Sequence, residues 1–137
     1  MNKEFVTYEQ ALALKELGFD DRTLTLWHIK REELISSPHK GICYGYSNSL
    51  DKPWIAAPLY QQAFRWFREK HNLCGEIQMD RTTEPKFCFV IFKYEHFGNY
   101  EKVEVDEWYL YRTYEEAEQV CLTKLIEITN AEIKNRG

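Results

Sequence analysis

The sequence lacks a long apolar run. Its longest uninterrupted apolar stretch covers residues 87–92, far short of the roughly 20 residues that a helix needs to cross a bilayer. The opening residues pass directly into a segment that carries Lys15 and Glu16, without the apolar core of a signal peptide. We therefore expect a cytoplasmic protein with no membrane helix and no export.

The cysteines lack a paired spacing. None of the four belongs to a C-x-x-C motif, and two lie inside apolar segments; they are Cys43, Cys74, Cys88 and Cys121. The four histidines add no finger-like spacing, which argues against a zinc site. We predict reduced thiols and expect neither a metal nor another cofactor.

Basic residues are not in excess. The formal net charge is −4, and seven acids lie between residues 101 and 118 against Lys102 and Arg112. Binding to nucleic-acid phosphates requires clustered lysine and arginine. Residues 65–71 place basic side chains beside Trp66, but Glu69 offsets them, and a solvated helix face is the favoured reading. We do not expect direct nucleic-acid binding.

Catalytic motifs are absent as well. Ser36, Ser37 and His39 lie close together in the sequence but have no nearby acid to orient the histidine. No metal-ligand spacing and no phosphate-binding glycine loop accompanies them. We therefore expect no enzymatic activity.

What the sequence has is a pentapeptide that occurs twice, as TYEQA at residues 7–11 and TYEEA at residues 113–117. In each copy the threonine is suited to cap a helix, and Gln10 or Glu116 completes a capping box. The similarity ends within about six residues, so two similar caps explain it better than a tandem repeat. The first helix is expected to end at Gly18, and the last to begin at Thr113.

The region between the two caps predicts one more helix and several strands. The helix is expected from Pro58 to residues 71–72, with an apolar stripe that contains Tyr60, Ala63, Phe64 and Phe67. Strands are expected at residues 24–28, 76–79, 86–95 and 102–111, with a short one at 42–46. The segment 102–111 is expected to form either one strand or two short ones around Asp106 and Glu107. Because residues 87–92 are apolar on both faces, that strand needs cover on both sides, from helices or from a partner subunit. We predict a single compact α+β domain over residues 1–137, an antiparallel sheet of three to five strands packed with three helices.

A surface for a protein partner is expected from aromatic and acidic residues. Aromatic residues make up 15% of the chain, more than a core of this size can fully bury. The candidates for exposed aromatic contacts are Tyr44, Tyr46, Trp54, Trp108 and Tyr109. The candidates for a negative ridge that docks on a basic groove are Glu101, Glu104, Asp106 and Glu107. The simpler alternatives are aromatics packed over a small sheet and a solvated strand edge.

Three segments resemble a known family. Residues 57–70 (APLYQQAFRWFREK), residues 113–128 (TYEEAEQVCLTKLIEI) and residues 5–11 (FVTYEQA) are similar to small uncharacterised phage and prophage proteins of Bacteroidetes bacteria. The likeness covers about a third of the chain and is absent between Leu24 and Asp51. The resemblance brings no catalytic residues with it.

What the resemblance implies is a context for function. Small, acidic phage proteins without a cofactor commonly bind a host protein, and RNA-guided nucleases are frequent targets of such inhibitors. We therefore expect a non-enzymatic binding protein that inhibits a host defence protein in the host cell cytoplasm, in the manner of anti-CRISPR proteins. The alternative is a phage structural or housekeeping protein that acts as a homo-oligomer, with the apolar strand at a homodimer interface.

Overall fold

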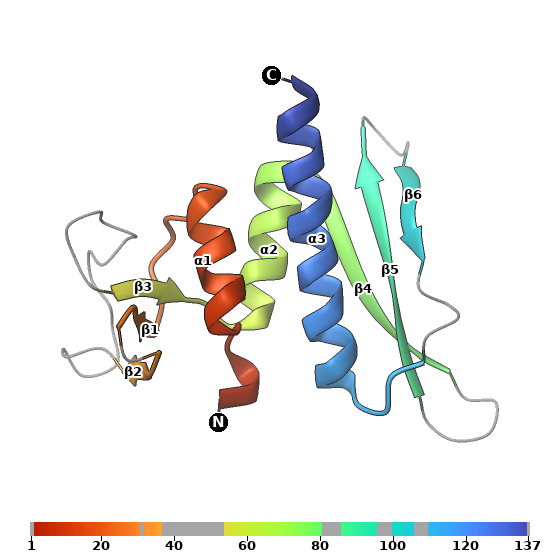
Figure 1. The fold of residues 1–137 in the computed structure, drawn as a ribbon. Coiled ribbons are helices and arrows are strands. Elements are labelled where there is room, and N and C mark those ends of the chain that lie inside the picture. Colours follow the sequence, from red (N-terminus) through yellow and green to blue (C-terminus); the bar gives the residue numbers. More distant parts are fainter. Residues whose placement is uncertain are drawn as a thin grey trace. The chain divides into compact units, whose positions relative to one another are not determined.

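The computed structural model describes residues 2–30, 32–36, 54–80, 86–95, 100–105 and 110–136. The chain divides into two compact units, Met1–Ala63 and Phe64–Gly137, and each is described by itself (Figure 1). Within these described ranges no helix is long and apolar enough to cross a membrane.

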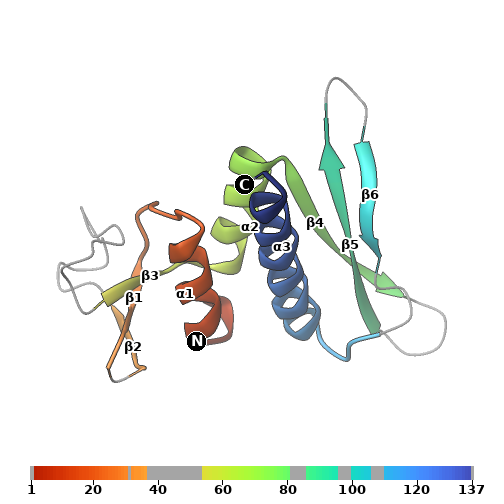
Figure 2. The same ribbon diagram turned by 45° about the horizontal axis from the view of Figure 1, so that its top comes forward.

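The first unit joins one helix to a small antiparallel sheet (Figure 2). Its elements are η1 (Asn2–Glu4), α1 (Tyr8–Glu16), β1 (Thr25–His28), β2 (Leu34–Ser36) and β3 (Trp54–Ala57). The strand order is β2-β1-β3, and both pairings are antiparallel. Helix α1 packs against β3, the edge strand that leads on to the next helix.

Helix α1 begins and ends where the sequence predicts. The backbone N–H of Gln10 donates to Thr7 Oγ1 over 3.2 Å. The backbone N–H of Thr7 donates to the side-chain Oε1 of Gln10 over 3.1 Å, which completes the capping box. Gly18 follows the helix with a φ of +98°, a left-handed conformation that glycine adopts without strain. The Phe19 amide then donates to the Leu14 carbonyl, and Phe19 is buried.

Strand β1 begins one residue later than the predicted 24–28 and buries polar side chains at its start. Leu24 precedes the strand and is 50% exposed, whereas Thr23 and Thr25 are buried. Both threonines are satisfied by backbone carbonyls: Thr25 Oγ1 donates to Ala57 O, and Thr23 Oγ1 donates to Thr25 O. The free-energy cost of burying these hydroxyls is small because each one donates a hydrogen bond to a carbonyl.

Helix α2 (Tyr60–His71) starts in the first unit and continues into the second. The predicted start at Pro58 is two residues early, because Leu59 still pairs with Phe5 in a β-bridge. The Pro58 carbonyl accepts the Val6 amide, so this residue belongs to the sheet-like connection. The predicted apolar stripe is confirmed: Tyr60, Ala63, Phe64 and Phe67 are all buried.

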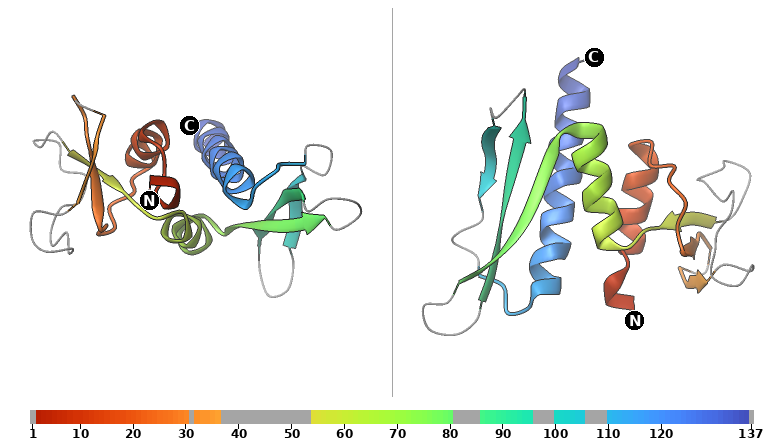
Figure 3. Two further views of the ribbon diagram at one scale, coloured as in Figure 1. Left: turned by 90° about the horizontal axis from the view of Figure 1, so that it is seen from below. Right: turned by 180° about the vertical axis from the view of Figure 1, so that it is seen from behind.

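The second unit is a three-stranded meander followed by a long helix (Figure 3). It contains β4 (Leu73–Asp80), β5 (Lys86–Tyr94), β6 (Tyr100–Val105) and α3 (Tyr114–Arg136), with strand order β4-β5-β6 and antiparallel pairing. Strand β4 is longer than the predicted 76–79, and β6 covers the first part of the predicted 102–111. Residues 106–109 lie outside the described residues, and Tyr111 forms an isolated bridge with Phe87. Helix α3 packs against β4 and β5.

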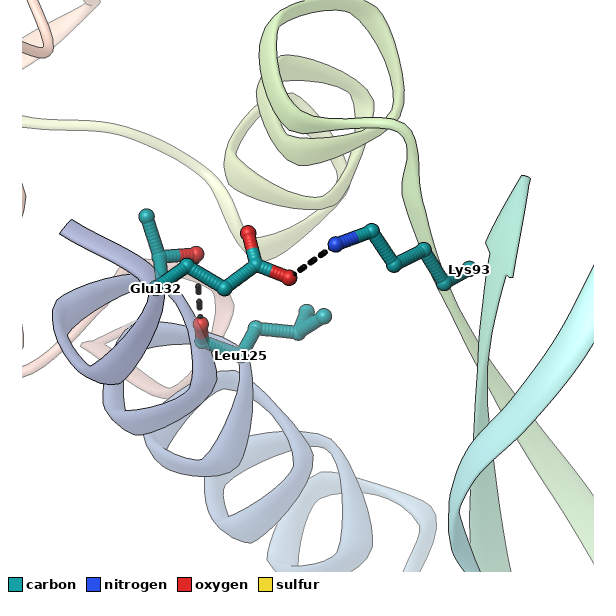
Figure 4. A network of polar contacts seen from close by, with 4 residues as sticks. Lys93, Leu125 and Glu132 are labelled. Atoms are coloured by element: carbon teal, nitrogen blue, oxygen red, sulfur yellow. Dashed lines mark hydrogen bonds and ion pairs between the residues drawn. The ribbon is translucent and has the colours of Figure 1, made fainter. Parts of the chain in front are cut away.

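Helix α3 begins after Thr113, as predicted, with the Glu116 amide donating to Thr113 Oγ1 over 3.1 Å. Ala117, Cys121 and Leu125 are buried, but two polar residues, Glu118 and Thr129, are buried with them. Thr129 is satisfied inside its own helix, because Oγ1 donates to the Leu125 carbonyl over 2.9 Å (Figure 4).

The α+β class is confirmed: antiparallel sheets pack with three α-helices in the described residues. Within the described ranges the strands form two sheets of three, whereas the sequence suggested one sheet. The expected strand at residues 42–46 lies outside the described residues. A single domain over residues 1–137 stays a prediction.

Candidate protein-binding surface

The sheet of the second unit has two unlike faces. A Cβ atom added at Gly75 would lie 2.8 Å from Cys121 Sγ and 3.3 Å from Leu125 Cδ1, so this position of β4 points toward α3. Residues opposite one another in an antiparallel pair share a face, and Ile91 lies opposite Gly75. The alternate residues of β5, including Phe92 and Tyr94, therefore point away from α3.

Three aromatic side chains gather on this open face. Tyr94 lies directly opposite Tyr100 across the β5–β6 pair. The rings of Phe92 and Tyr100 meet edge to face, with centroids 5.5 Å apart and planes at 82°. Tyr94 is 45% exposed and Tyr100 is 64% exposed. We call Phe92, Tyr94 and Tyr100 the aromatic patch.

The aromatic patch occupies one end of the open face. Val90, in the middle of β5, is buried, whereas exposure rises toward Tyr94. A side-chain hydrogen bond with Cys74 is the main cause that raises the pKa of the Tyr94 hydroxyl. Cys74 lies opposite Phe92, so the thiol belongs to the same face.

The opposite face of the sheet is held firmly by α3. The Lys93 ammonium forms a half-buried ion pair with Glu132 of α3 (Figure 4). The rings of Phe87 and Tyr114 also meet edge to face, 5.9 Å apart. Because a helix covers one side, the aromatic patch stands on strands whose positions are fixed by packing.

A β-bulge brings two of the predicted acidic residues to one side of β6. The register shifts between Ile91 and Phe92, so Glu104 lies opposite Ile91 while Lys102 lies opposite Phe92. Glu101 is exposed and lies opposite Lys93. In a regular strand, positions 101 and 104 would fall on opposite faces; the bulge places both at register positions on the α3 side. Glu101 therefore lies on the other face of the sheet from the aromatic patch.

The remaining predicted contact residues are not brought together in the described structure. Trp54 is half-buried in β3 of the first unit. The others lie outside the described residues: Tyr44, Tyr46, Asp106, Glu107, Trp108 and Tyr109. Their place in a binding surface stays a prediction.

Titratable groups in the second unit are shifted by burial. Burial raises the pKa of the Cys121 thiol, which keeps it protonated and unreactive. Burial also raises the pKa of Glu118 to about 7, with a smaller contribution from Glu115. Burial lowers the pKa of His71, an effect that Glu132 partly opposes. In the described part of the chain, no group of three or more metal-ligating side chains is close enough to hold an ion.

The sequence prediction missed all three residues of the aromatic patch. A signal was available, because Tyr94 and Tyr100 each lie three residues from Phe97, in the segment between the predicted strands 86–95 and 102–111. Positions at equal distances from the centre of a hairpin connection pair with one another and share a face. Counting outward from Phe97 would have placed the two tyrosines side by side.

Comparisons with known proteins give no relative: no protein-family model, no curated protein and no solved structure matches the chain. The resemblance to phage proteins therefore stays a prediction.

Proposed function

We propose that this chain is a non-enzymatic binding protein that docks onto another protein through the aromatic patch. The observation that carries the proposal is the exposure of Tyr94 and Tyr100, which lie opposite one another on strands fixed by α3. Tyrosine offers an apolar ring and a hydroxyl with few rotatable bonds, and it is enriched among residues that dominate binding energy.

We infer that the partner is a host defence protein and that the chain inhibits it in the host cell cytoplasm, as anti-CRISPR proteins do. Two things support this: the resemblance to phage proteins, and the exposed acidic residue Glu101 on the edge strand β6. An RNA-guided nuclease holds its nucleic acid in a positively charged channel. An acidic edge is complementary to such a channel and speeds association with it.

The same patch also suits a second copy of the chain, which is the homo-oligomer alternative. Isologous contacts through one sheet face are common in symmetric dimers. Light scattering at micromolar concentration separates the two: a dimer whose mass halves in Tyr94→Ser/Tyr100→Ser favours the homo-oligomer, and a strict monomer removes it.

The test of the inhibitor proposal is a plaque assay in strains where an RNA-guided nuclease restricts a phage. Expression of the chain should restore plaques, and the double variant Tyr94→Ser/Tyr100→Ser should not. Ile133→Ser is the matched control, because Ile133 is 49% exposed on α3 of the same unit. The proposal fails if the unchanged chain restores no plaques, or if the double variant protects as well as the control.

A further inference from the structure

A cavity of about 320 Å³ lies wholly within the first unit, at the start of α1. Its wall combines Phe5 from the segment before α1, Tyr8 from the first residue of α1 and Trp27 from β1. Two acidic residues complete it, Glu9 in the first turn of α1 and Glu32 in the turn after β1. Its volume is at the lower end of the range for ligand pockets, which suits a small group.

The aromatic wall is fixed by hydrogen bonds that leave the ring surfaces available. Trp27 Nε1 donates to the Val6 carbonyl over 3.0 Å. The Tyr8 hydroxyl donates to the Ile29 carbonyl over 3.2 Å. The two rings meet edge to face at 6.0 Å and 78°. Because their polar atoms already have backbone partners, a ligand would meet mainly the apolar and π surfaces.

The two carboxylates give the cavity its charge. Glu32 is held in the turn by its amide, which donates to the His28 carbonyl over 2.8 Å, and its φ is +50°. Glu9 and Glu32 are both exposed, and neither carboxylate forms an ion pair within the described residues. Among the described residues that line the cavity there is no lysine, arginine or histidine.

We propose that this cavity binds an organic ammonium ion of the size of a lysine side chain. Aromatic rings attract cations through their negative faces, and cages of such rings recognise alkylammonium groups. The two carboxylates add two full negative charges, which outweigh the roughly half positive charge at the N-terminus of α1. The capping box further satisfies the Gln10 amide, one of the donors that an anion would need. This site is separate from the aromatic patch and does not depend on its function.

The test follows the indole N–H of Trp27 by ¹H–¹⁵N NMR during titration with three probes. They are N-acetyl-lysine N-methylamide, n-butylammonium and the uncharged N-acetyl-norleucine N-methylamide. The lysine probe should bind with millimolar affinity, and its binding should weaken as the salt concentration is raised. The norleucine probe should bind much more weakly than the lysine probe. Equal binding of butylammonium would assign the site to free amines, and tighter binding of the lysine probe would assign it to peptides.

Variants locate the binding at the carboxylates. The double variant Glu9→Gln/Glu32→Gln should lower the affinity for the lysine probe by about tenfold. The neighbouring Glu33→Gln should leave this affinity unchanged. Glu32→Gly provides a second variant that removes one carboxylate while favouring the positive φ, so weaker binding there does not come from misfolding. The proposal is wrong if norleucine binds as well as lysine, if inorganic phosphate shifts Trp27 and amines do not, or if Glu9→Gln/Glu32→Gln binds like Glu33→Gln.

Discussion

The two units use the same plan, a three-stranded antiparallel sheet with a helix, but place their aromatic side chains differently. In the first unit the polar atoms of Tyr8, Trp27 and Tyr60 all bond to acceptors inside that unit. In the second unit Tyr94 and Tyr100 project from the open face of the sheet and are largely exposed. An aromatic residue that is largely buried and whose polar atom is bound internally serves the fold, whereas one whose ring is exposed to solvent can contact a partner.

The helices also differ in how they are held. Helix α1 is fixed by directional bonds, which are its capping box and the bond from the Tyr60 hydroxyl to Gln10. Helix α3 packs on β4 and β5 through buried apolar side chains, and Gly75 of β4 faces Cys121 and Leu125 of this helix. Variants in the first unit should therefore act through hydrogen bonds, and variants in the second through steric fit.

The largest effect is expected from Gly75→Val. A Cβ there would lie 2.8 Å from Cys121 Sγ and 3.0 Å from Phe64 Cε1, so these buried side chains or the strand itself must shift. The free energy of unfolding should fall by about 3 kcal/mol in urea denaturation. At Gly18 in the first unit, an added Cβ would have no atom within 4 Å, so Gly18→Ala strains only the backbone. It should lower the free energy of unfolding by about 1 kcal/mol. Equal losses at the two glycines would contradict the steric account.

The next effect concerns Glu118. Its pKa is raised to about 7 by burial, so the folded state favours the protonated acid. The protonated Glu118 contributes its full stabilisation of the folded state below the unfolded pKa near 4.5. This contribution to the free energy of unfolding is lost as pH rises toward 7. Glu118→Gln should therefore raise the free energy of unfolding at pH 8 by about 2 kcal/mol and change it little at pH 4. The exposed Glu127→Gln on the same helix should show no such difference between the two pH values.

The smallest effect separates the two kinds of tyrosine. Tyr60→Phe removes the bond of 2.9 Å to Gln10 Oε1 in a buried site and should cost about 1 kcal/mol in urea denaturation. Tyr94→Phe, at the exposed patch, should change stability by less than about 0.5 kcal/mol. A larger loss at Tyr94 than at Tyr60 would mean that the patch serves the fold.

Much of the fold was predictable because its signals are local. The cap at Thr7, the stop at Gly18 and the apolar stripe of α2 each depend on residues a few positions apart, and the structure confirms them. The division of the strands into two sheets depends on pairings between distant residues, such as Thr25 with Ala57, that no local pattern encodes. The buried Thr25 shows the same limit, since its partner carbonyl is 32 residues away.

The candidate site was predicted less well. Glu101 is exposed on β6, and its register relative to Glu104 is set by a bulge that no local sequence pattern predicts. Trp54 was assigned to the surface from its type alone and is half-buried in β3. The tyrosines of the aromatic patch were overlooked because the exposure of their rings depends on which face of the sheet α3 covers. That face is determined by tertiary packing at Gly75.

The most direct test of the aromatic patch is site-specific photo-cross-linking in host cells. A photoreactive phenylalanine analogue replaces Tyr100 in one strain and Ile133 in another, two exposed positions on different elements of the second unit. The account predicts a cross-link from position 100 to one host defence protein, absent from position 133 and lost when Tyr94→Ser is added. Cross-links of equal yield from both positions, or none from position 100, would contradict it.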